Sequence, residues 1–513
     1  MKKHVLALLL LAALLMSLFS GCGSKPTDMA PADNSAAADE STGSKRNDVN
    51  IYCEGVWQSL DPYGPSCTTN TNMYLIYQVY ECLVRVDDAG EVVPVLATDW
   101  TVDDSGTVYT FNLRQGVKFH NGEEMKASDV AYSFNRAMSE AALEPYYNYI
   151  DKVEASGDYV VTITLKDVFA PFVSYLKEFP IVSEKFASEN ELLTAECGTG
   201  PYVLESIDLN TEAVLTAFPD YWQGPASIQK ATFKVITEAT TAAVAFETGD
   251  LDVLFCYNVS SYAPLEETGK YNTQLVTANH TAVILLNNAV EPLNDKRVRQ
   301  ALSYATDRDT MIAVAYEGLA LPTYLMANPY SFGLNEDQFY NHYEFNLEKA
   351  KELLAEAGYP DGLDLGDMTV IGNSYHEKYA QVWQQSLAQI GVTINIVSSE
   401  SAVADTVNHD YITATMGETF TEDMAYTSNY YVMDNKCCYD NEEVADLYDE
   451  AAKELDPAKR EELYAKIVDI IYDECPNIPI FNKEVPWVWD KNLTMTPHKD
   501  PGRQLYVYEM SWN

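Results

Sequence analysis

The sequence predicts an α/β protein, because strand patterns and helix patterns alternate along its length. Apolar and polar residues alternate at 108–113 and 160–165, which is typical of half-buried strands. Apolar residues at helical spacing follow at 347–357 and 463–470. A chain of 513 residues, 47% of them hydrophobic, is long enough for two or three domains with separate cores.

The N-terminus predicts export and lipid attachment. An apolar run at 5–19 follows two lysines and is too short to cross a bilayer of about 30 Å comfortably as a helix. Residues 1–21 are therefore interpreted as a signal peptide. Cys22 at the cleavage point resembles a bacterial lipobox, in which the thiol is diacylated, and two acyl chains give stable anchoring. The alternative is an ordinary signal peptide with an incidental cysteine. Residues 22–48, rich in Ser, Ala, Gly, Pro, Asp and Lys, are expected to be the lipid anchor and a flexible tether.

The body begins with a strand, a helix and a hairpin. Residues 50–60 alternate and end in a turn, which predicts a strand. Residues 72–83 carry apolar side chains at helical spacing. Two short apolar runs, 83–86 and 92–95, flank the turn residues 87–90 and predict a hairpin.

Later helices are predicted from the residues that would cap them. Ser128 is expected to cap a short helix, Asn346 a second and Asp456 a third, since short polar side chains satisfy the first free N–H groups of a helix. Apolar runs at 392–397 and 478–481 predict buried strands.

The charge balance excludes one class of partner. There are 77 acidic and 33 basic residues, which gives a net charge of −44. Nucleic acid is excluded, because binding phosphates requires a positive surface. The acidity fits either cationic ligands or repulsion and solubility at an anionic cell surface.

No motif predicts catalysis, a cofactor or a metal. The sequence lacks a GxSxG elbow, an HExxH pair and a GxxxxGK[ST] loop, and its seven histidines are scattered. We therefore expect a protein that is not an enzyme and binds no cofactor. The 36 tyrosines and 7 tryptophans favour a cleft that holds a small amphipathic ligand. Eight cysteines remain besides Cys22, and their pairing is not determined by the sequence, so disulfides and free thiols both stay open.

Ordered sequence blocks run through the body from about residue 50 to the end. The longest is YTFNLRQGVKFHNG at 109–122, followed by GTGPY at 198–202, GDLDV at 249–253 and NDKRVRQAL at 294–302. This series resembles the family 5 bacterial extracellular solute-binding proteins, the dipeptide- and oligopeptide-binding lipoproteins of ABC importers.

The resemblance implies a bilobed clamshell like the type II periplasmic binding proteins, with an additional inserted domain. It implies three domains, one of them discontinuous. The core of lobe one would combine residues 49–84, 194–280 and 490–513, with the inserted domain at 85–193. Lobe two would span 281–489.

The resemblance also implies a function. We expect a receptor, lipid-anchored at the extracellular face of the cell membrane of a Gram-positive type envelope, that captures a short peptide by lobe closure. It would act as a monomer and deliver the peptide to the transmembrane subunits of an ABC permease. The same role for a nickel chelate, an opine-like compound or an oligosaccharide is the alternative, followed by a surface hydrolase or an adhesin.

In peptide-binding members of the family, an acidic residue of lobe two holds the peptide amine, in a segment with a Trp and an Asp-Pro. Here Glu418 stands at the Trp position, proline is absent, and the expected Asp falls near Thr421. The anchoring acid is therefore left open among Glu418, Glu422 and Asp423. Asn287 matches a family Asn near the cleft, and the first strand and turn border it. The predicted ligand-binding residues are Glu418, Thr419, Phe420, Thr421, Glu422, Asp423, Asn287, Trp57 and Ser59.

Overall fold

The computed structural model describes residues 46–513 apart from 65, 66, 68, 256–258, 328–329, 335–341, 373–374, 420–422 and 433–434. Arg46–Asn513 belong to one structural unit. The predicted signal peptide, Cys22 and nearly all of the predicted tether lie outside the described residues. Across the part that is described, no helix has both the length and the apolar character needed to span a bilayer.

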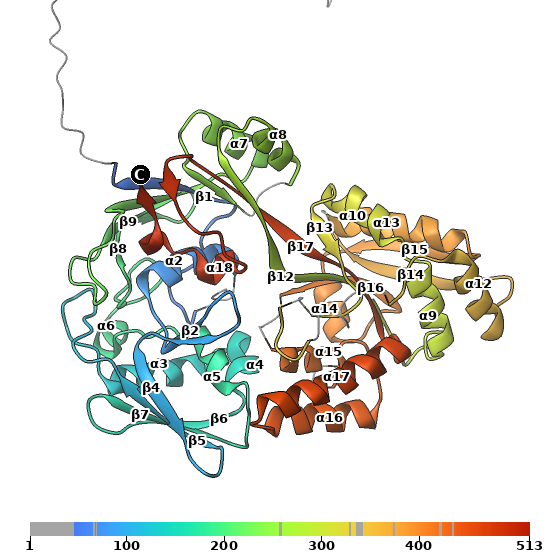
Figure 1. The fold of residues 1–513 in the computed structure, drawn as a ribbon, viewed down its shortest axis with the longest axis horizontal. Coiled ribbons are helices and arrows are strands. Elements are labelled where there is room, and N and C mark those ends of the chain that lie inside the picture. The colour runs from blue at the N-terminus through green and yellow to red at the C-terminus, as the bar shows by residue number, and fades with distance from the viewer. Residues whose placement is uncertain are drawn as a thin grey trace, which may run out of the picture. The chain divides into compact units, whose positions relative to one another are not determined.

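An 11-stranded sheet runs through the whole unit and confirms the α/β prediction. Its order is β15-β14-β16-β12-β17-β11-β1-β10-β9-β8, and β13 (Ala320–Pro322) pairs with β17 off this path. Figure 1 shows the two halves of the unit on either side of two long strands, β12 (Asn272–Leu286) and β17 (Asn477–Trp489). We call residues 46–271 and 490–513 lobe one and residues 287–476 lobe two, and the two long strands join them.

Lobe one holds the strands at one end of this sheet. Strand β1 (Asp48–Cys53) lies in its centre and pairs in parallel with β10 (Lys230–Val235) on one side and β11 (Val253–Phe255) on the other. Beyond β10 follow β9 (Glu212–Ala217) and β8 (Tyr202–Asp208), paired antiparallel. The helices of this part are α2 (Asn70–Val79), α6 (Glu184–Glu189), α7 (Ala239–Glu247), α8 (Tyr262–Glu267) and α18 (Pro501–Gln504).

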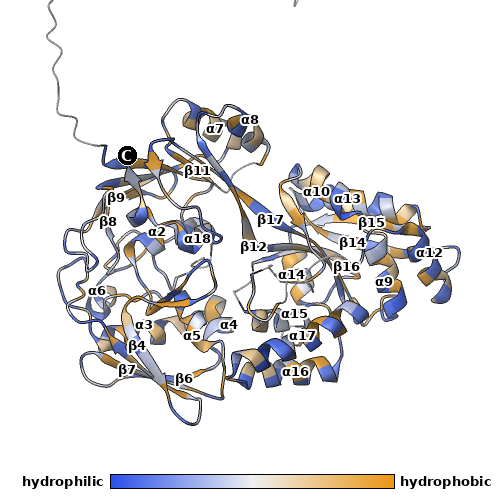
Figure 2. Ribbon diagram, viewed as in Figure 1, coloured by the Kyte–Doolittle hydropathy of each residue, from blue (hydrophilic) through white to orange (hydrophobic). Residues whose placement is uncertain are grey.

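Lobe two packs helices on both faces of its half of the sheet. Alternate residues of β12 serve the two faces: Ala282 and Ile284 enter one core, Val283 and Leu285 the other, as the period of two in a strand requires. Figure 2 shows hydrophilic stretches on α16, whose buried residues face the second core. The strands are β14 (Leu363–Ile371), β15 (Val392–Ser399) and β16 (Thr413–Thr419); the helices are α9 (Lys296–Tyr304), α10 (Arg308–Tyr316), α12 (Leu347–Glu356), α13 (Tyr375–Ala388), α14 (Ala402–Val407), α15 (Ser428–Tyr431), α16 (Glu442–Lys453) and α17 (Pro457–Glu474).

A separate four-stranded sheet with order β4-β5-β7-β6 lies within the residues assigned to the inserted domain. The predicted hairpin precedes it, as β2 (Val84–Val86) paired with β3 (Val92–Pro94). The exact domain boundaries stay a prediction. The elements are β4 (Ala97–Val102), β5 (Val108–Leu113), β6 (Ile150–Ala155), β7 (Val160–Leu165), α3 (Ala127–Ala137), α4 (Glu144–Tyr147) and α5 (Phe172–Tyr175).

Two predicted caps are confirmed and one is wrong. The Asn346 side chain accepts from the Lys349 N–H and that of Asp456 from the Ala458 N–H. Ser128, in contrast, lies inside the first turn of α3, which begins one residue earlier. There the Asp129 carboxylate accepts the Lys126 N–H at 2.9 Å, so the N-terminus of the helix is capped by an acid at the third helical position and not by a residue before the helix.

The strand predicted at 50–60 ends early, at Cys53. Beyond that residue the backbone leaves the sheet and bonds to loops instead: Trp57 N–H donates to the Leu209 carbonyl and Leu60 N–H to that of Leu193. The seven cysteines among the described residues are free thiols, all buried except the half-buried Cys438; Cys256 lies outside the described residues.

Candidate functional site

The two lobes touch each other at the inserted domain. The ring of Tyr146, from α4, stacks on Tyr426 of lobe two with centroids 6.5 Å apart and an angle of 20° between the planes. Nearby, Ala170 N–H donates to the Ala452 carbonyl at 2.7 Å. In Figure 1, α4 lies well below β12 and β17 in the view. The lobes are therefore joined by two strands and also meet at the inserted domain, through an aromatic pair and a backbone hydrogen bond.

Lobe one brings a largely covered arginine, with a side chain 13% exposed, to this region. Arg503 lies between two carboxylates: its Nη2 is 2.8 Å from Glu178 Oε2, and its Nη1 is 3.0 Å from Asp500 Oδ2. Burial acts to lower the pKa of Arg503, but the two carboxylates raise it well above its usual range. Burial acts to raise the pKa of Asp500, and Arg503 holds it below its usual value. Arg503 and Asp500 are therefore both charged at neutral pH.

Lobe two brings a single acid that pairs with a lysine. Glu418, in β16, accepts the Tyr430 hydroxyl at 2.8 Å and pairs with Lys436 Nζ at 2.9 Å. Burial, and then Glu418, raises the pKa of Tyr426. Burial, and then Glu178, raises the pKa of Tyr146. The stacked tyrosines therefore lie within electrostatic reach of an acid from each lobe.

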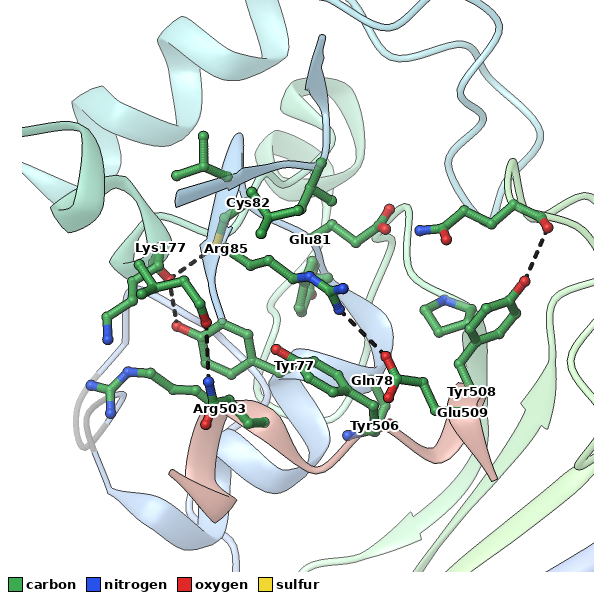
Figure 3. Close-up of a pocket in the computed structure, with 18 of the residues that line it drawn as sticks. Tyr77, Gln78, Glu81, Cys82, Arg85, Lys177, Arg503, Tyr506, Tyr508 and Glu509 are labelled. Carbon is green, nitrogen blue, oxygen red and sulfur yellow. Dashed lines mark hydrogen bonds and ion pairs between the residues drawn. The ribbon is translucent and has the colours of Figure 1, made fainter. Parts of the chain in front are cut away.

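A cavity of about 330 Å³ opens in lobe one beside Arg503. The β2–β3 hairpin, the end of α2 and the C-terminal segment form its walls, and none of the described residues of lobe two lines it. Figure 3 shows Arg503, Lys177 and Tyr77 on one side of the view, and Tyr508 with Glu509 on the other. Its lining combines tyrosines with charged groups: Tyr77, Tyr221, Tyr506 and Tyr508, with Glu81, Arg85, Lys177, Asp500, Arg503 and Glu509.

One wall of this cavity holds a carboxyl that is hydrogen-bonded but not ion-paired. Glu81 accepts the hydroxyl of Thr199 at 2.9 Å, that of Tyr221 at 2.8 Å and the indole N–H of Trp222 at 3.1 Å. Burial raises the pKa of Glu81 to about 7, and the three donors limit that rise. Elsewhere in the lining, Arg85 pairs with Glu509 at 3.5 Å.

The structure separates the acids predicted in lobe two. Glu418 carries the Lys436 pair, and the neighbouring Thr419 is exposed, with its Oγ1 at 3.3 Å from His280 Nδ1. Asp423 is buried and accepts Arg460 Nη2 at 2.8 and 2.9 Å. Phe420, Thr421 and Glu422 lie outside the described residues.

The remaining predicted residues lie in two further places. Asn287 is buried at the end of β12, where its amide donates to the Tyr411 carbonyl at 2.9 Å. Trp57 and Ser59 lie together in lobe one, both buried, and the Ser59 hydroxyl accepts the Asp61 N–H. Sequence patterns missed Arg503 and Glu178, because 325 positions separate them and neither stands in a recognisable motif.

Two α/β lobes that are linked by paired strands and meet through aromatic and charged side chains define a clamshell solute-binding protein. A family model described as bacterial extracellular solute-binding proteins, family 5 Middle, matches residues 91–437. The chain therefore belongs to family 5 of the bacterial extracellular solute-binding proteins, which confirms the resemblance. It is an extracytoplasmic solute-binding component of an ABC importer and not an enzyme.

Similar proteins cover nearly the full length of the chain. The glutathione-binding protein GsiB of Escherichia coli K12 is 28% identical over 473 residues, covering 87% of this chain and 91% of its own. The nickel-binding periplasmic protein of the same strain is 29% identical over 462 residues, covering 82% and 87%. The solved structure of the ABC transporter-associated binding protein DppA from Helicobacter pylori with the peptide STSA superposes with a TM-score of 0.75 at 26% identity, covering 91% and 98%.

Proposed function

We propose that this protein is a lipid-anchored receptor that captures a short peptide between its lobes and delivers it to an ABC permease. It acts as a monomer at the extracellular face of the cell membrane, in an envelope of the Gram-positive type. Two relatives support a peptide cargo: one is named for glutathione, itself a tripeptide, and one was solved with a tetrapeptide.

The observation that carries the peptide proposal is that each lobe brings side chains of both charges to the region of the tyrosine contact. Arg503 with its carboxylates comes from lobe one, and Glu418 with Lys436 comes from lobe two. A peptide with free termini is a zwitterion, so it offers a carboxylate to a cation and an ammonium to an acid. Because the ligand gains partners on both lobes only when they approach, its binding favours closure.

The size and lining of the cavity support a short peptide. A volume of about 330 Å³ lies near the lower end of the range for small-ligand sites, about 300–1,000 Å³. Its tyrosines combine an apolar ring with a hydrogen-bonding tip, which suits side chains of varied chemistry. We further propose that the segment Glu418–Asp423 faces the ligand from lobe two, and that Trp57 and Ser59 border it from lobe one.

A non-peptide cargo is the second candidate, and one observation favours it. Glu418 is already neutralised by Lys436, so it presents no free carboxylate to a peptide amine. One relative is named for nickel. Among the described residues, no group of three or more His, Cys, Asp or Glu side chains could hold a metal ion, so a nickel cargo would be recognised as a chelate and not as the bare ion.

Calorimetry on the mature protein tests the cargo. The panel contains Ala-Ala, Ala-Ala-Ala, glutathione and a nickel–histidine chelate, and mass spectrometry of the denatured protein identifies any ligand that co-purifies. We expect micromolar or tighter binding of at least one peptide, with a smaller radius of gyration by X-ray scattering when it binds. Binding of the chelate alone would contradict the peptide proposal. Recovery of cleaved peptide after incubation would indicate a hydrolase instead.

The proposed anchor needs its own experiment. Labelling of cells with an alkynyl fatty acid should mark the wild-type protein and leave the Cys22→Ser variant unmarked and released into the medium. The anchor would keep the receptor near its permease through a tether of about 25 residues, which raises the local concentration. Retention of the Cys22→Ser variant at the membrane would contradict lipid attachment.

A further inference from the structure

The strand order gives one residue of lobe one a distinctive place. Strand β17 runs from lobe two into lobe one, where its Trp487 pairs with Phe255 and its Trp489 with Val253. Strand β11 therefore runs toward lobe two, and so does its parallel neighbour β1. Glu54 follows the last residue of β1. It lies at the carboxyl end of the parallel strands, on the side that faces lobe two, where open α/β sheets bind ligands.

The Glu54 carboxylate lacks a counter-charge. Its Oε1 accepts the Tyr74 hydroxyl at 2.8 Å, while the buried Oε2 has no hydrogen-bond partner within the described part of the chain. Burial raises the pKa of Glu54, and among the described residues no lysine, arginine or histidine forms an ion pair with it. Leaving a buried acceptor unsatisfied costs about 1–3 kcal/mol, and more for a charged group. The residue as a whole is half-buried, and its Oε2 atom is covered in this conformation, so a ligand would reach the carboxylate only after a local rearrangement.

Two buried donors lie in lobe one and in the adjoining end of β17. The indole N–H groups of Trp57 and Trp487 have no acceptor among the residues that the structure describes. Trp487 connects to Glu54 through rings: it stacks on Phe255 at 4.7 Å, and Phe255 packs edge-on against Tyr74 at 5.1 Å. Trp57 follows Glu54 by three residues. An unsatisfied acid and two unsatisfied donors therefore lie around the ends of β1 and β11.

Four other acids near the lobe contact already have cationic partners, and Glu81 already accepts hydrogen bonds on both of its oxygens. Glu418 pairs with Lys436, and Asp423 with Arg460. Glu178 and Asp500 share Arg503. Each of these four acids would have to give up a cation before it could bind another, whereas Glu54 would only gain one.

We propose that Glu54 is the anchor for the cationic group of the cargo, the α-ammonium of a peptide, with the carbonyl next to that ammonium accepting from a neighbouring indole. This inference rests on the proposed peptide function and assigns the amine to lobe one, not to the acidic loop of lobe two. The ammonium supplies the charge and the donors that Glu54 Oε2 lacks, so the interaction forms without breaking an existing ion pair.

A thermodynamic cycle tests this assignment with the tightest peptide found by calorimetry and its N-acetyl derivative. Glu54→Gln keeps the shape and removes the charge, and Glu418→Gln is the matched control in lobe two. We expect Glu54→Gln to weaken binding of the free peptide at least tenfold, and acetylation to do the same in the wild type. Acetylation should cost little further in Glu54→Gln, whereas it should keep its full effect in Glu418→Gln.

Other outcomes overturn the proposal. Unchanged peptide affinity in Glu54→Gln would refute the anchor but not the receptor function. The same conclusion would follow if acetylation lost its effect in Glu418→Gln or Glu422→Gln and kept it in Glu54→Gln. Failure of every peptide to bind the wild type would refute the peptide function and the anchor together. If Glu54→Gln does not fold, Glu54→Asp retains the charge one methylene further back and should bind with intermediate affinity.

Discussion

Asp423 offers a sharp test of how lobe two is held together. The perturbation is Asp423→Asn, which keeps the size and the hydrogen bond to Ala425 N–H but removes the charge. Asp423 and Arg460 are each 7% exposed, and Arg460 Nη2 lies 2.8 and 2.9 Å from the two carboxylate oxygens. Removing one member of such a pair leaves a buried charge without its partner. We therefore expect a loss of about 3–5 kcal/mol in the free energy of unfolding.

The same substitution at an exposed pair provides the control. Asp473, near the end of α17, lies 2.6 Å from Lys296, with side chains 63% and 42% exposed. Asp473→Asn should therefore cost no more than about 1 kcal/mol. Urea unfolding followed by circular dichroism measures both variants. The reasoning fails if Asp423→Asn changes the stability as little as Asp473→Asn does, or if Asp423→Asn removes peptide binding while stability is unchanged.

Three further predictions concern other parts of the molecule. Burial acts to lower the pKa of His498, but Asp88 at 2.8 Å and Glu509 raise it to about 9. The stabilisation that protonated His498 gives the folded state is thus complete below the unfolded pKa of about 6.5 and is lost as pH rises through about 9. The thermal midpoint should fall over this pH window, and it should fall less in His498→Gln. A Cβ at Gly198 would lie 1.8 Å from the Val79 carbonyl oxygen, so Gly198→Ala should lower stability by about 3 kcal/mol, whereas Gly372→Ala, with open space around it, should be neutral in the same urea titration. Removing the aromatic contact between lobes by Tyr426→Ala should weaken cargo binding about 2- to 13-fold, since such stacks contribute about 0.5–1.5 kcal/mol. Adding Tyr146→Ala should then have little further effect, and additive losses in calorimetry would contradict the contact.

Local features of the fold were predictable from the sequence, because their causes lie within a few residues. The caps at Asn346 and Asp456 depend on hydrogen bonds to N–H groups two or three residues ahead. The strand end at Cys53 was not predictable, since the residues after it bond to Leu193 and Leu209, far along the chain. The alternation of apolar and polar residues continues to residue 60, past the point where the partner strand β10 stops.

The candidate site was predictable only in outline. The resemblance directed attention to the segment Glu418–Asp423, but the charges that fill it come from elsewhere: Lys436 neutralises Glu418, and Arg460 neutralises Asp423. Neither pairing leaves a trace in local composition. The same holds for Glu54, whose significance lies in the cation that its surroundings lack and not in any motif.

The two long strands that join the lobes have an interrupted ladder. Thr277 pairs with Glu484 and Thr281 with Asn482, so three residues of β12 stand opposite Lys483 alone. A pair of strands with such a bulge can act as a hinge. It bends where the hydrogen bonds between the strands are already missing, and the paired segments on either side stay stiff. Rotation of the lobes would then proceed without unzipping any of the sheet. The elastic resistance to closing stays low, and a weakly bound cargo can still shift the balance between open and closed forms.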